Sequence, residues 1–335
     1  MVTIAVIGCG YWGPNYVRTF NELPSSNVCS CCDLDVTRLN YVKGIYPFIK
    51  TTTNHLRILD NPRIDAVCVS TPASTHYGIV KESLLHGKHV LVEKPLTLNV
   101  KEGEDLMKTA QDQNRILMIG HVYLYHPAVQ KVKNIIQNNE LGELHYLHSV
   151  RTGLGPIRRD VNAMWDLAPH DISIYLHLLG QIPKNVSARG ASYLQNNVED
   201  VVSLSMEFPR KIMGFIHVSW LDARKTREMT IVGKTKMVVF NDTNSNEKLK
   251  IYHQGVATRE PSTYGEFLLQ VRTGDIFAPK IESTEPLRKQ CMDFVECIEK
   301  GSEPLSNGKE GLKVLKVLEA AQLSLKNDGS LVEIK

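Results

Sequence analysis

A Gly-x-Gly-x-x-Gly motif, Gly8 to Gly13, follows directly on the apolar run at residues 3–7 and constrains the fold more than any other feature. An uninterrupted apolar run is typical of a strand that is buried on both faces of a parallel sheet. Gly8 allows a sharp turn, Gly10 allows a pyrophosphate to approach the backbone, and Gly13 allows the next helix to pack closely on the sheet. Pro14 suits the first turn of that helix, whose free amides attract phosphate groups.

A second apolar run at residues 28–32 leads into Asp33, 20 residues after Gly13. Dinucleotide-binding sheets carry an acidic residue at this place, where it accepts hydrogen bonds from the adenosine ribose. Its carboxylate would repel the 2′-phosphate of NADP, so the sequence favours NAD as the cofactor. Arg38 leaves three roles open, because it can stack on adenine, pair with a 2′-phosphate or stay solvated.

Length, charge and cysteine usage limit the class of protein. The chain has 335 residues, which suggests about two domains. Its net charge of +3 argues against nucleic acid or a membrane surface as partner, and no apolar stretch reaches the ~18 residues of a membrane span. The chain enters a strand without a basic and apolar leader, which predicts a cytoplasmic protein. The seven cysteines match no zinc spacing, so no metal is expected.

The first ~120 residues alternate between strand and helix patterns, which predicts a parallel sheet with helices on both faces. The expected strands are residues 3–8, 28–33, 64–70, 88–93 and 115–120, and the expected helices are about 13–22, 36–44, 75–86 and 99–113.

The second half changes to longer, alternating strands, which are typical of an antiparallel sheet with one covered face. Its expected strands are 143–153, 185–194, 200–208, 212–220, 227–232, 235–240 and 248–253, and its expected helices are about 127–139, 166–179, 286–300 and 308–327. The loop at 254–285 is long enough to cover a site or a neighbouring subunit. We therefore predict an α/β protein with a Rossmann domain at 1–122 and an α+β domain with an open, mainly antiparallel sheet at 123–335.

Two loops follow the carboxyl ends of predicted parallel strands, where such sheets bind their ligands. They are Ser70-Thr71-Pro72 and Glu93-Lys94-Pro95. Beside a positively charged nicotinamide the pKa of Lys94 would fall, so that it could hold a substrate hydroxyl or relay a proton. The alternative is an ordinary surface lysine after a strand.

A third element is the segment from Trp165 to Asp171. If it starts a helix, Asp166 and His170 lie at i and i+4 on one face, where the carboxylate raises the pKa of the imidazole and orients it. Such a pair makes a general base near neutral pH. The alternative is a helix-capping Asp166 and a packed, structural His170.

Together these motifs resemble, nearly end to end, the Gfo/Idh/MocA family of glucose–fructose oxidoreductases, inositol dehydrogenases and rhizopine-catabolism proteins. The resemblance implies that Lys94 touches both substrate and nicotinamide ribose, with a Lys94–Pro95 peptide that is often cis, and that His170 accepts the proton. It also implies a homodimer or homotetramer formed through the C-terminal sheet. The expected cofactor contacts are Gly8, Gly10, Tyr11, Trp12, Gly13, Asp33, Arg38, Ser70, Thr71, Pro72, His76, Glu93 and Lys94. The expected substrate contacts are Lys94, His121, Tyr123, Arg158, Arg159, Asn162, Trp165, Asp166 and His170.

Finer features resemble one branch, the nucleotide-sugar 3-dehydrogenases of surface-polysaccharide and lipid A pathways. They are the sequence from Gly10 to Asn15, Gly120-His121 with Tyr125-His126-Pro127, residues 155–162 and Gly274-Asp275-Ile276. The resemblance implies oxidation of the 3-hydroxyl of UDP-N-acetylglucosamine or its uronic acid, before an aminotransferase acts. Asp166-Leu-Ala-Pro-His170 stands where the uronic-acid enzymes carry Asn-Ile-Gly-x-His, which favours the neutral sugar.

Two other interpretations stay open. An inositol or free-sugar dehydrogenase shares the family motifs, but it does not need the paired Arg158 and Arg159, which could hold a pyrophosphate. A non-catalytic, NAD-binding regulator of transcription shares the fold. It has no use for a proton-transfer set such as Lys94, Asp166 and His170.

Overall fold

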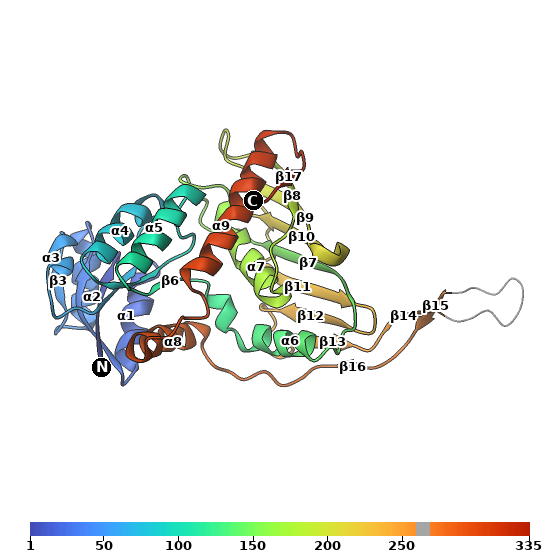
Figure 1. The fold of residues 1–335 in the computed structure, drawn as a ribbon, viewed down its shortest axis with the longest axis horizontal. Helices are drawn as coiled ribbons and strands as arrows, with labels where there is room; N and C mark the ends of the chain where they lie inside the picture. The colour runs from blue at the N-terminus through green and yellow to red at the C-terminus, as the bar shows by residue number, and fades with distance from the viewer. Residues whose placement is uncertain (259–268) are drawn as a thin grey trace, which may run out of the picture. The chain divides into compact units, whose positions relative to one another are not determined.

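The structure, a computed structural model, describes residues 1–258 and 269–335. The chain forms two compact units, which are drawn in Figure 1. The first comprises Met1–Tyr125 and Thr284–Lys316, and the second comprises His126–Ser283 and Val317–Lys335. The expected division at 122/123 gave residues 284–316 to the second domain, whereas here they pack within the first.

The first unit is built on a six-stranded parallel sheet in the order β3-β2-β1-β4-β5-β6. Its strands are β1 (Val2–Ile7), β2 (Ser26–Cys32), β3 (Lys50–Thr52), β4 (Ala66–Val69), β5 (His89–Val92) and β6 (Leu117–Ile119). Ile7 aligns with Cys32 on one side and with Val69 on the other, so the loops after these three strands start at the same edge of the sheet. This is the edge at which parallel sheets bind ligands.

Helices cover both faces of this sheet, as the alternation of strand and helix predicts. The helices of this unit are α1 (Gly13–Glu22), α2 (Val36–Ile45), α3 (Leu56–Leu59), α4 (His76–Leu85), α5 (Val100–Asp112) and α8 (Pro286–Lys300), with the first part of α9 (Gly308–Lys326). Val80 of α4 and Leu106 of α5 belong to one buried cluster with Val67 and Val90 of the sheet. α1 and α8 pack on each other and contact the sheet through β2 and β1.

Three features of this unit differ from the expectation. The edge strand β3 and the short helix α3 were not predicted, because three and four residues are too few to show a period. The helix α8 was expected in the second domain, yet it packs on α1, where the rings of Phe20 and Phe294 lie 6.4 Å apart. An apolar helical stripe predicts that a helix is buried, but not which sheet it covers.

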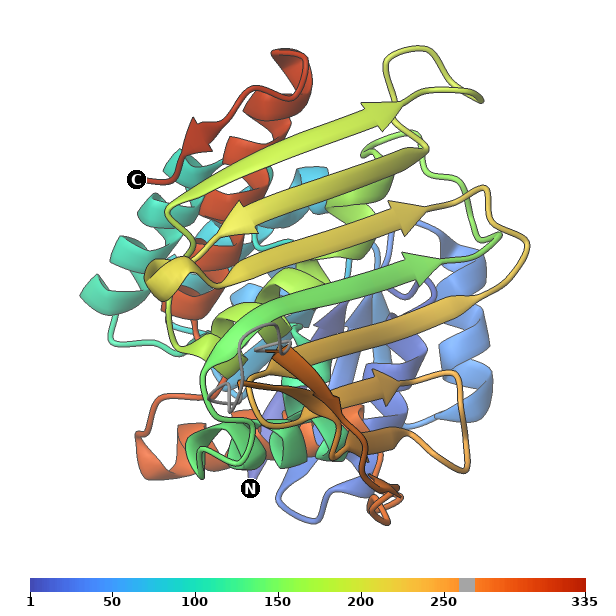
Figure 2. The same ribbon diagram turned by 90° about the vertical axis from the view of Figure 1, so that its right-hand side faces the viewer.

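The second unit is built on a nine-stranded, mostly antiparallel sheet, seen face-on in Figure 2. Its order is β16-β13-β12-β11-β7-β10-β9-β8-β17, in which the neighbours β7 and β10 run parallel. The strands are β7 (Leu144–Thr152), β8 (Asn185–Ala191), β9 (Val201–Glu207), β10 (Met213–Ser219), β11 (Thr226–Gly233), β12 (Met237–Asn241), β13 (Leu249–Tyr252), β16 (Ile276–Phe277) and β17 (Val332–Glu333). A separate hairpin pairs β14 (Gly255–Thr258) with β15 (Leu269–Arg272).

The helix α7 (Ala163–Leu179) packs on the middle strands β7, β9 and β10, and α6 (Pro127–Gln137) packs on α7. The opposite face of the sheet exposes Tyr146 and Phe215, whose rings meet edge to face at 6.4 Å. The expected oligomer through this sheet stays a prediction.

The expected loop at 254–285 contains β14, β15 and β16. Residues 259–268 of that loop lie outside the described residues. Its expected role as a cover for a site or a neighbouring subunit stays a prediction.

A buried ion pair holds α7 on this sheet. Arg151 of β7 binds Asp171 of α7 through Nε at 2.7 Å and Nη2 at 3.2 Å, and both side chains are buried. Loss of either partner of this buried ion pair would destabilise the fold, because a buried charge without its partner has a high free energy.

We expect Asp171→Asn to lower the free energy of unfolding by about 3–5 kcal/mol, since it removes the carboxylate charge that the buried Arg151 binds at 2.7 Å. The matched control is Glu296→Gln, which removes an exposed i,i+4 partner of Lys300 and should cost less than about 0.5 kcal/mol. Chemical denaturation followed by fluorescence measures both. Equal costs would contradict the role given to the buried pair.

Candidate active site

The glycine motif forms the turn between β1 and α1. Gly8 has φ +96°, and a Cβ built there would lie 2.7 Å from the carbonyl carbon of Ser70. A Cβ built on Gly13 would overlap the carbonyl oxygen of Gly8, whereas one on Gly10 would meet only the Arg38 guanidinium at 3.7 Å. Space therefore remains beside Gly10, where a dinucleotide needs close access to the backbone.

The start of α1 also suits a phosphate. The indole of Trp12 makes no capping hydrogen bond, and the first turn carries no acidic side chain. The amides at this helix end therefore keep their donor capacity and their partial positive charge. Trp12 and Tyr11 are 37% and 84% exposed on the same loop, where a bound cofactor would cover them.

Asp33 is fixed at the end of β2 by backbone amides. Its Oδ2 accepts a hydrogen bond from Cys9 N at 2.6 Å, and its Oδ1 accepts one from Asp35 N at 2.8 Å. Arg38 lies 3.7 Å from Asp33 and 3.5 Å from Asp35, so two carboxylates balance its charge. A 2′-phosphate would have to compete with both, which supports the expectation that NAD is preferred to NADP.

Side chains connect the loops at this edge of the sheet. Ser70 Oγ donates to Gly8 O at 2.7 Å, which joins the loops after β4 and β1. The buried ring of His76 contacts Pro95 O through Nδ1 at 2.8 Å and Thr71 O through Nε2 at 3.0 Å, which joins the loops after β5 and β4. Both ring nitrogens of His76 face these two backbone carbonyls, and its expected contact with the cofactor stays a prediction.

Lys94 lies in the loop after β5, and its peptide bond to Pro95 is cis, as the family resemblance implies. The adjacent Glu93 accepts a 2.7 Å hydrogen bond from Tyr16 Oη and a 3.1 Å hydrogen bond from Lys94 N. Burial raises the pKa of the Glu93 carboxyl, while Tyr16 and the charge of Lys94 act to lower it. Two donors thus engage the partly buried Glu93 carboxyl, and its expected contact with the cofactor stays a prediction.

His121 follows β6 at the same edge and is buried, with 1% of its surface exposed. Neither of its ring nitrogens has a hydrogen-bond partner among the described residues. Burial, helped by the charge of Lys94, lowers the pKa of His121 to about 3, so the ring is neutral near neutral pH. Buried polar groups normally have a hydrogen-bond partner, so the imidazole of His121 is suited to bind a ligand or a water molecule. This agrees with its expected role in substrate binding.

In the second unit, α7 begins at Ala163, three residues before the expected start at 166, and it contains both Asp166 and His170. Asp166 Oδ1 accepts from Arg158 Nη1 at 3.4 Å, and Oδ2 accepts from Trp220 Nε1 at 3.2 Å. Pro169 lies inside the helix between the two predicted catalytic residues and has no amide hydrogen to donate. The hydrogen bonds from Arg158 and Trp220 fix the Asp166 carboxylate. Its proposed action on His170 stays a prediction.

Other predicted substrate contacts have structural partners. Asn162 caps α7 by accepting from Trp165 N at 3.1 Å, and its amide donates to Glu199 Oε2 at 2.6 Å. The Trp165 indole donates to Gln322 Oε1 at 2.9 Å. Both side chains are buried, with 7% of their surface exposed, and their expected contact with the substrate stays a prediction.

The two neighbouring arginines differ. Arg158 makes a two-point contact with Asp160, with its Nε at 2.9 Å and its Nη2 at 2.6 Å, in addition to the Asp166 bond. Arg159 is exposed. The guanidinium of Arg158 is thus already engaged by carboxylates, and Arg159 is the better candidate for an anionic substrate group.

Three residues that were not predicted hold predicted site residues in place: Tyr16, Asp160 and Trp220. No local sequence pattern marks these three residues. The partners of Tyr16 and Trp220 are distant in sequence, and the partner of Asp160 lies two residues away in an irregular loop. Tyr123 was expected in the substrate site and lies in the 3₁₀ turn after His121.

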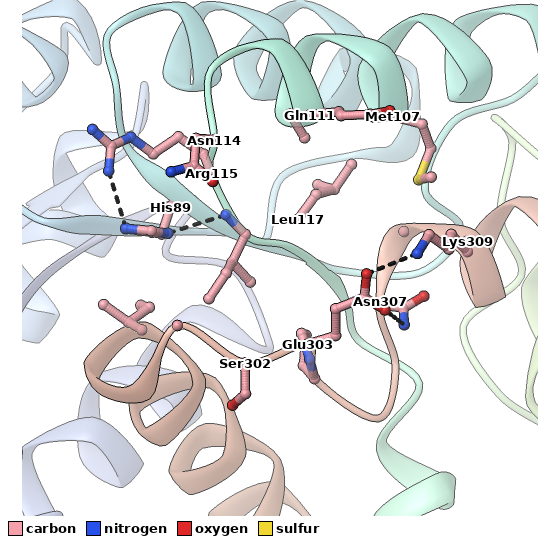
Figure 3. A pocket seen from close by; sticks show the side chains of 16 residues that line it. His89, Met107, Gln111, Asn114, Arg115, Leu117, Ser302, Glu303, Asn307 and Lys309 are labelled. Carbon is pink, nitrogen blue, oxygen red and sulfur yellow. Dashed lines mark hydrogen bonds and ion pairs between the residues drawn. The ribbon is translucent and has the colours of Figure 1, made fainter.

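A cavity of about 570 Å³ lies in the first unit, at the amino ends of β5 and β6 (Figure 3). This is the opposite edge of the sheet from Gly8 and Lys94. Lys309 binds Glu303 at 2.7 Å there, and Arg115 lies 3.4 Å from His89 Nε2. Because parallel sheets bind ligands at their carboxyl ends, we do not assign the cofactor to this cavity.

Among residues 1–258 and 269–335, no group of three His, Cys, Asp or Glu side chains is arranged to hold a metal ion. Within the same described part of the chain, no helix is long and apolar enough to cross a membrane.

Comparisons with known proteins agree with this architecture. Residues 2–121 match a model described as an oxidoreductase family with an NAD-binding Rossmann fold, and residues 129–239 match the GFO/IDH/MocA C-terminal domain. The chain is 30% identical over 196 residues to the UDP-N-acetylglucosamine 3-dehydrogenase of Acidithiobacillus ferrooxidans, covering 58% of this chain and 60% of that enzyme. It is 21% identical to an inositol 2-dehydrogenase of Rhizobium meliloti, covering 97% of both. A solved structure of the Acidithiobacillus enzyme superposes with a TM-score of 0.81 at 23% identity, covering 97% of each chain, which shows the shared fold.

We expect Gly13→Ala to destabilise the first unit by about 1–3 kcal/mol, because the new methyl group overlaps the Gly8 carbonyl. NAD binding should weaken at least about tenfold, since the motif must then open. The control is Gly44→Ala on the exposed side of α2, where a built Cβ meets nothing within 4 Å. It should gain about 0.5–1 kcal/mol and leave NAD affinity unchanged. Calorimetric titration and thermal unfolding test both, and unchanged NAD affinity in Gly13→Ala would argue against the assigned site.

Proposed function

The chain belongs to the Gfo/Idh/MocA family of NAD-binding oxidoreductases, and we propose that it oxidises the C3 hydroxyl of a nucleotide sugar. The proposed substrate is UDP-N-acetylglucosamine or its uronic acid. The neutral sugar is preferred, because Asp166-Leu-Ala-Pro-His170 differs from the uronic-acid pattern. The reaction converts the secondary alcohol and NAD+ into a ketone, NADH and a proton.

The residues at the carboxyl edge of the sheet fit a bound dinucleotide. Gly10 leaves space for the pyrophosphate, the start of α1 offers amides, and Asp33 would accept hydrogen bonds from the adenosine ribose. When bound, NAD+ supplies the hydride acceptor for the carbinol hydrogen. Tyr11 and Trp12 would then lie under the cofactor.

The proton is handled by this chain's own side chains. Lys94 holds the reacting hydroxyl, and His170 accepts its proton as general base. Asp166, held by Arg158 and Trp220, stabilises the resulting imidazolium. His121 stays neutral at working pH and offers a hydrogen bond to the substrate without adding charge.

The choice of substrate class rests on one observation, the 30% identity over 196 residues to a UDP-N-acetylglucosamine 3-dehydrogenase. The exposed Arg159 supports it, because a guanidinium is a common partner for a diphosphate. We further propose a homodimer or homotetramer through the exposed face of the nine-stranded sheet, and an aminotransferase that uses the 3-keto product.

A second candidate is a dehydrogenase of inositol or a free sugar. It is favoured by the engagement of Arg158 with Asp160 and Asp166, which leaves less positive charge for a diphosphate than two free arginines would. The resemblance to inositol 2-dehydrogenase extends over 97% of the chain, although the identity is only 21%.

The substrate assignment is tested by following NADH formation with NAD and UDP-N-acetylglucosamine, beside free N-acetylglucosamine and myo-inositol. We expect turnover of the nucleotide sugar alone, with an aminotransferase and glutamate present to consume the 3-keto product. In the same assay Arg159→Ala should raise KM about tenfold or more, since a charge-assisted contact is lost. Preferred turnover of inositol or the free sugar would overturn the proposal in favour of the second candidate.

We expect Lys94→Ala and His170→Ala to fold and to bind NAD within about threefold of the wild type. Turnover by His170→Ala should fall by about 10²–10⁴, the usual cost of losing a general base, and Lys94→Ala should fall comparably. Lys309→Ala, which removes a lysine at the opposite edge of the sheet, is the control and should keep full turnover. If either variant retains wild-type turnover, the catalytic role proposed for the replaced residue is wrong. If the variants do not fold, the result supports the alternative that these residues are structural.

A further inference from the structure

Tyr16 lies three residues after Gly13, on the side of α1 that packs into the protein. Its side chain is completely buried and stacks on Phe20, with ring centroids 6.2 Å apart. Packing alone would be served equally well by phenylalanine. A buried hydroxyl is stable only when it is hydrogen-bonded, so the partner of this hydroxyl explains its presence.

That partner is Glu93 Oε1, 2.7 Å away. Burial, and then the neighbouring Glu93, raise the pKa of Tyr16 well above its usual value, so the hydroxyl stays protonated and acts as the donor. The thiols of Cys68 and Cys291 also lie near Tyr16, and burial raises the pKa of both, which keeps them neutral. The Tyr16 hydroxyl thus fixes one oxygen of the Glu93 carboxyl.

The other oxygen, Glu93 Oε2, accepts the backbone N–H of Lys94 at 3.1 Å. The carboxyl also packs tightly on Gly120, where a built Cβ would lie 3.1 Å from Oε2. It therefore has little freedom to turn while Tyr16 holds it. On the far side of Lys94, the carbonyl of Pro95 is held by His76 at 2.8 Å.

We propose that Tyr16 is a positioning residue for Lys94. Tyr16 acts through the Glu93 carboxyl and so couples the dinucleotide-binding helix α1 to the loop after β5. The inference rests on the proposed function, because it matters for catalysis only if Lys94 holds the substrate hydroxyl. A small displacement of a reacting group is enough to cost a large factor in rate. The placement of α1 by a bound dinucleotide is thereby transmitted to Lys94 through two hydrogen bonds.

Three variants test the coupling: Tyr16→Phe, Glu93→Gln and the double variant. Tyr16→Phe removes only the hydroxyl, and we expect kcat to fall about tenfold or more with NAD affinity within about twofold. The control is Tyr77→Phe, which removes another tyrosine–carboxylate bond of this unit, the 2.9 Å contact with Asp105, and should keep wild-type kcat. The double variant should lose no more than Glu93→Gln, because both changes break one connection.

A second readout does not depend on turnover. The rate at which a lysine-selective acylating reagent labels Lys94 is measured against pH by mass spectrometry, with the exposed Lys309 as internal reference. We expect the profile of Lys94 to change at least twofold in Tyr16→Phe and to stay the same in Tyr77→Phe. If Lys94→Ala keeps wild-type turnover, the proposed function fails, while the labelling still decides whether Tyr16 positions Lys94.

Three results would overturn the inference: wild-type kcat and labelling in Tyr16→Phe, an equal loss in Tyr77→Phe, or additive losses in the double variant. If Tyr16→Phe does not fold, Glu93→Gln decides alone. Its amide keeps the volume of the carboxyl, so an unchanged Lys94 labelling profile in that variant would also overturn the inference.

Discussion

The predicted active site depends on side-chain hydrogen bonds that join the loops at the carboxyl edge of the parallel sheet. A sheet fixes where each strand ends, but it leaves the following loop free. Ser70, His76 and Glu93 remove this freedom, because each binds a backbone group of a neighbouring loop or of its own. The bond from His76 to Pro95 O is buried and the other two are partly buried, and losing a partner costs more at such places than at a fully exposed one. Some of the residues named by the motifs therefore also hold the loops of the predicted site in place.

The second unit applies the same principle with charges. Arg151 and Asp171 fix α7 on the sheet, and Arg158 with Trp220 fixes the carboxylate of Asp166 at the start of that helix. A carboxylate with two donors keeps one orientation. Pro169 interrupts the regular helical bonding close by, so Asp166 gains this order from tertiary contacts and not from the helix itself.

Local sequence patterns predict part of this structure and fail for definable reasons. The parallel sheet is identified by the glycine motif and by the continuous apolar runs of β1, β4 and β5. Strands that are buried on both faces must be apolar along their whole length. The short strand β3 shows no period, and α8 packs on a sheet that its own sequence cannot specify. In the site, type and spacing identified Lys94, Asp166 and His170 as candidates. They could not reveal that Tyr16 faces Glu93, because 77 residues separate the two.

Charge balance separates the two candidate substrates more sharply than the motifs do. Two adjacent arginines in a sequence suggest a strong site for a diphosphate. In the structure Asp160 and Asp166 neutralise Arg158, which leaves Arg159 as the exposed guanidinium of that pair. A nucleotide sugar would then depend on Arg159 and on any rearrangement that releases Arg158 from Asp160. A free polyol would need neither, and it would gain from the carboxylates as acceptors for its hydroxyl groups. In the proposed site, the partners of Arg158, more than its presence, would therefore decide between the two candidate substrates.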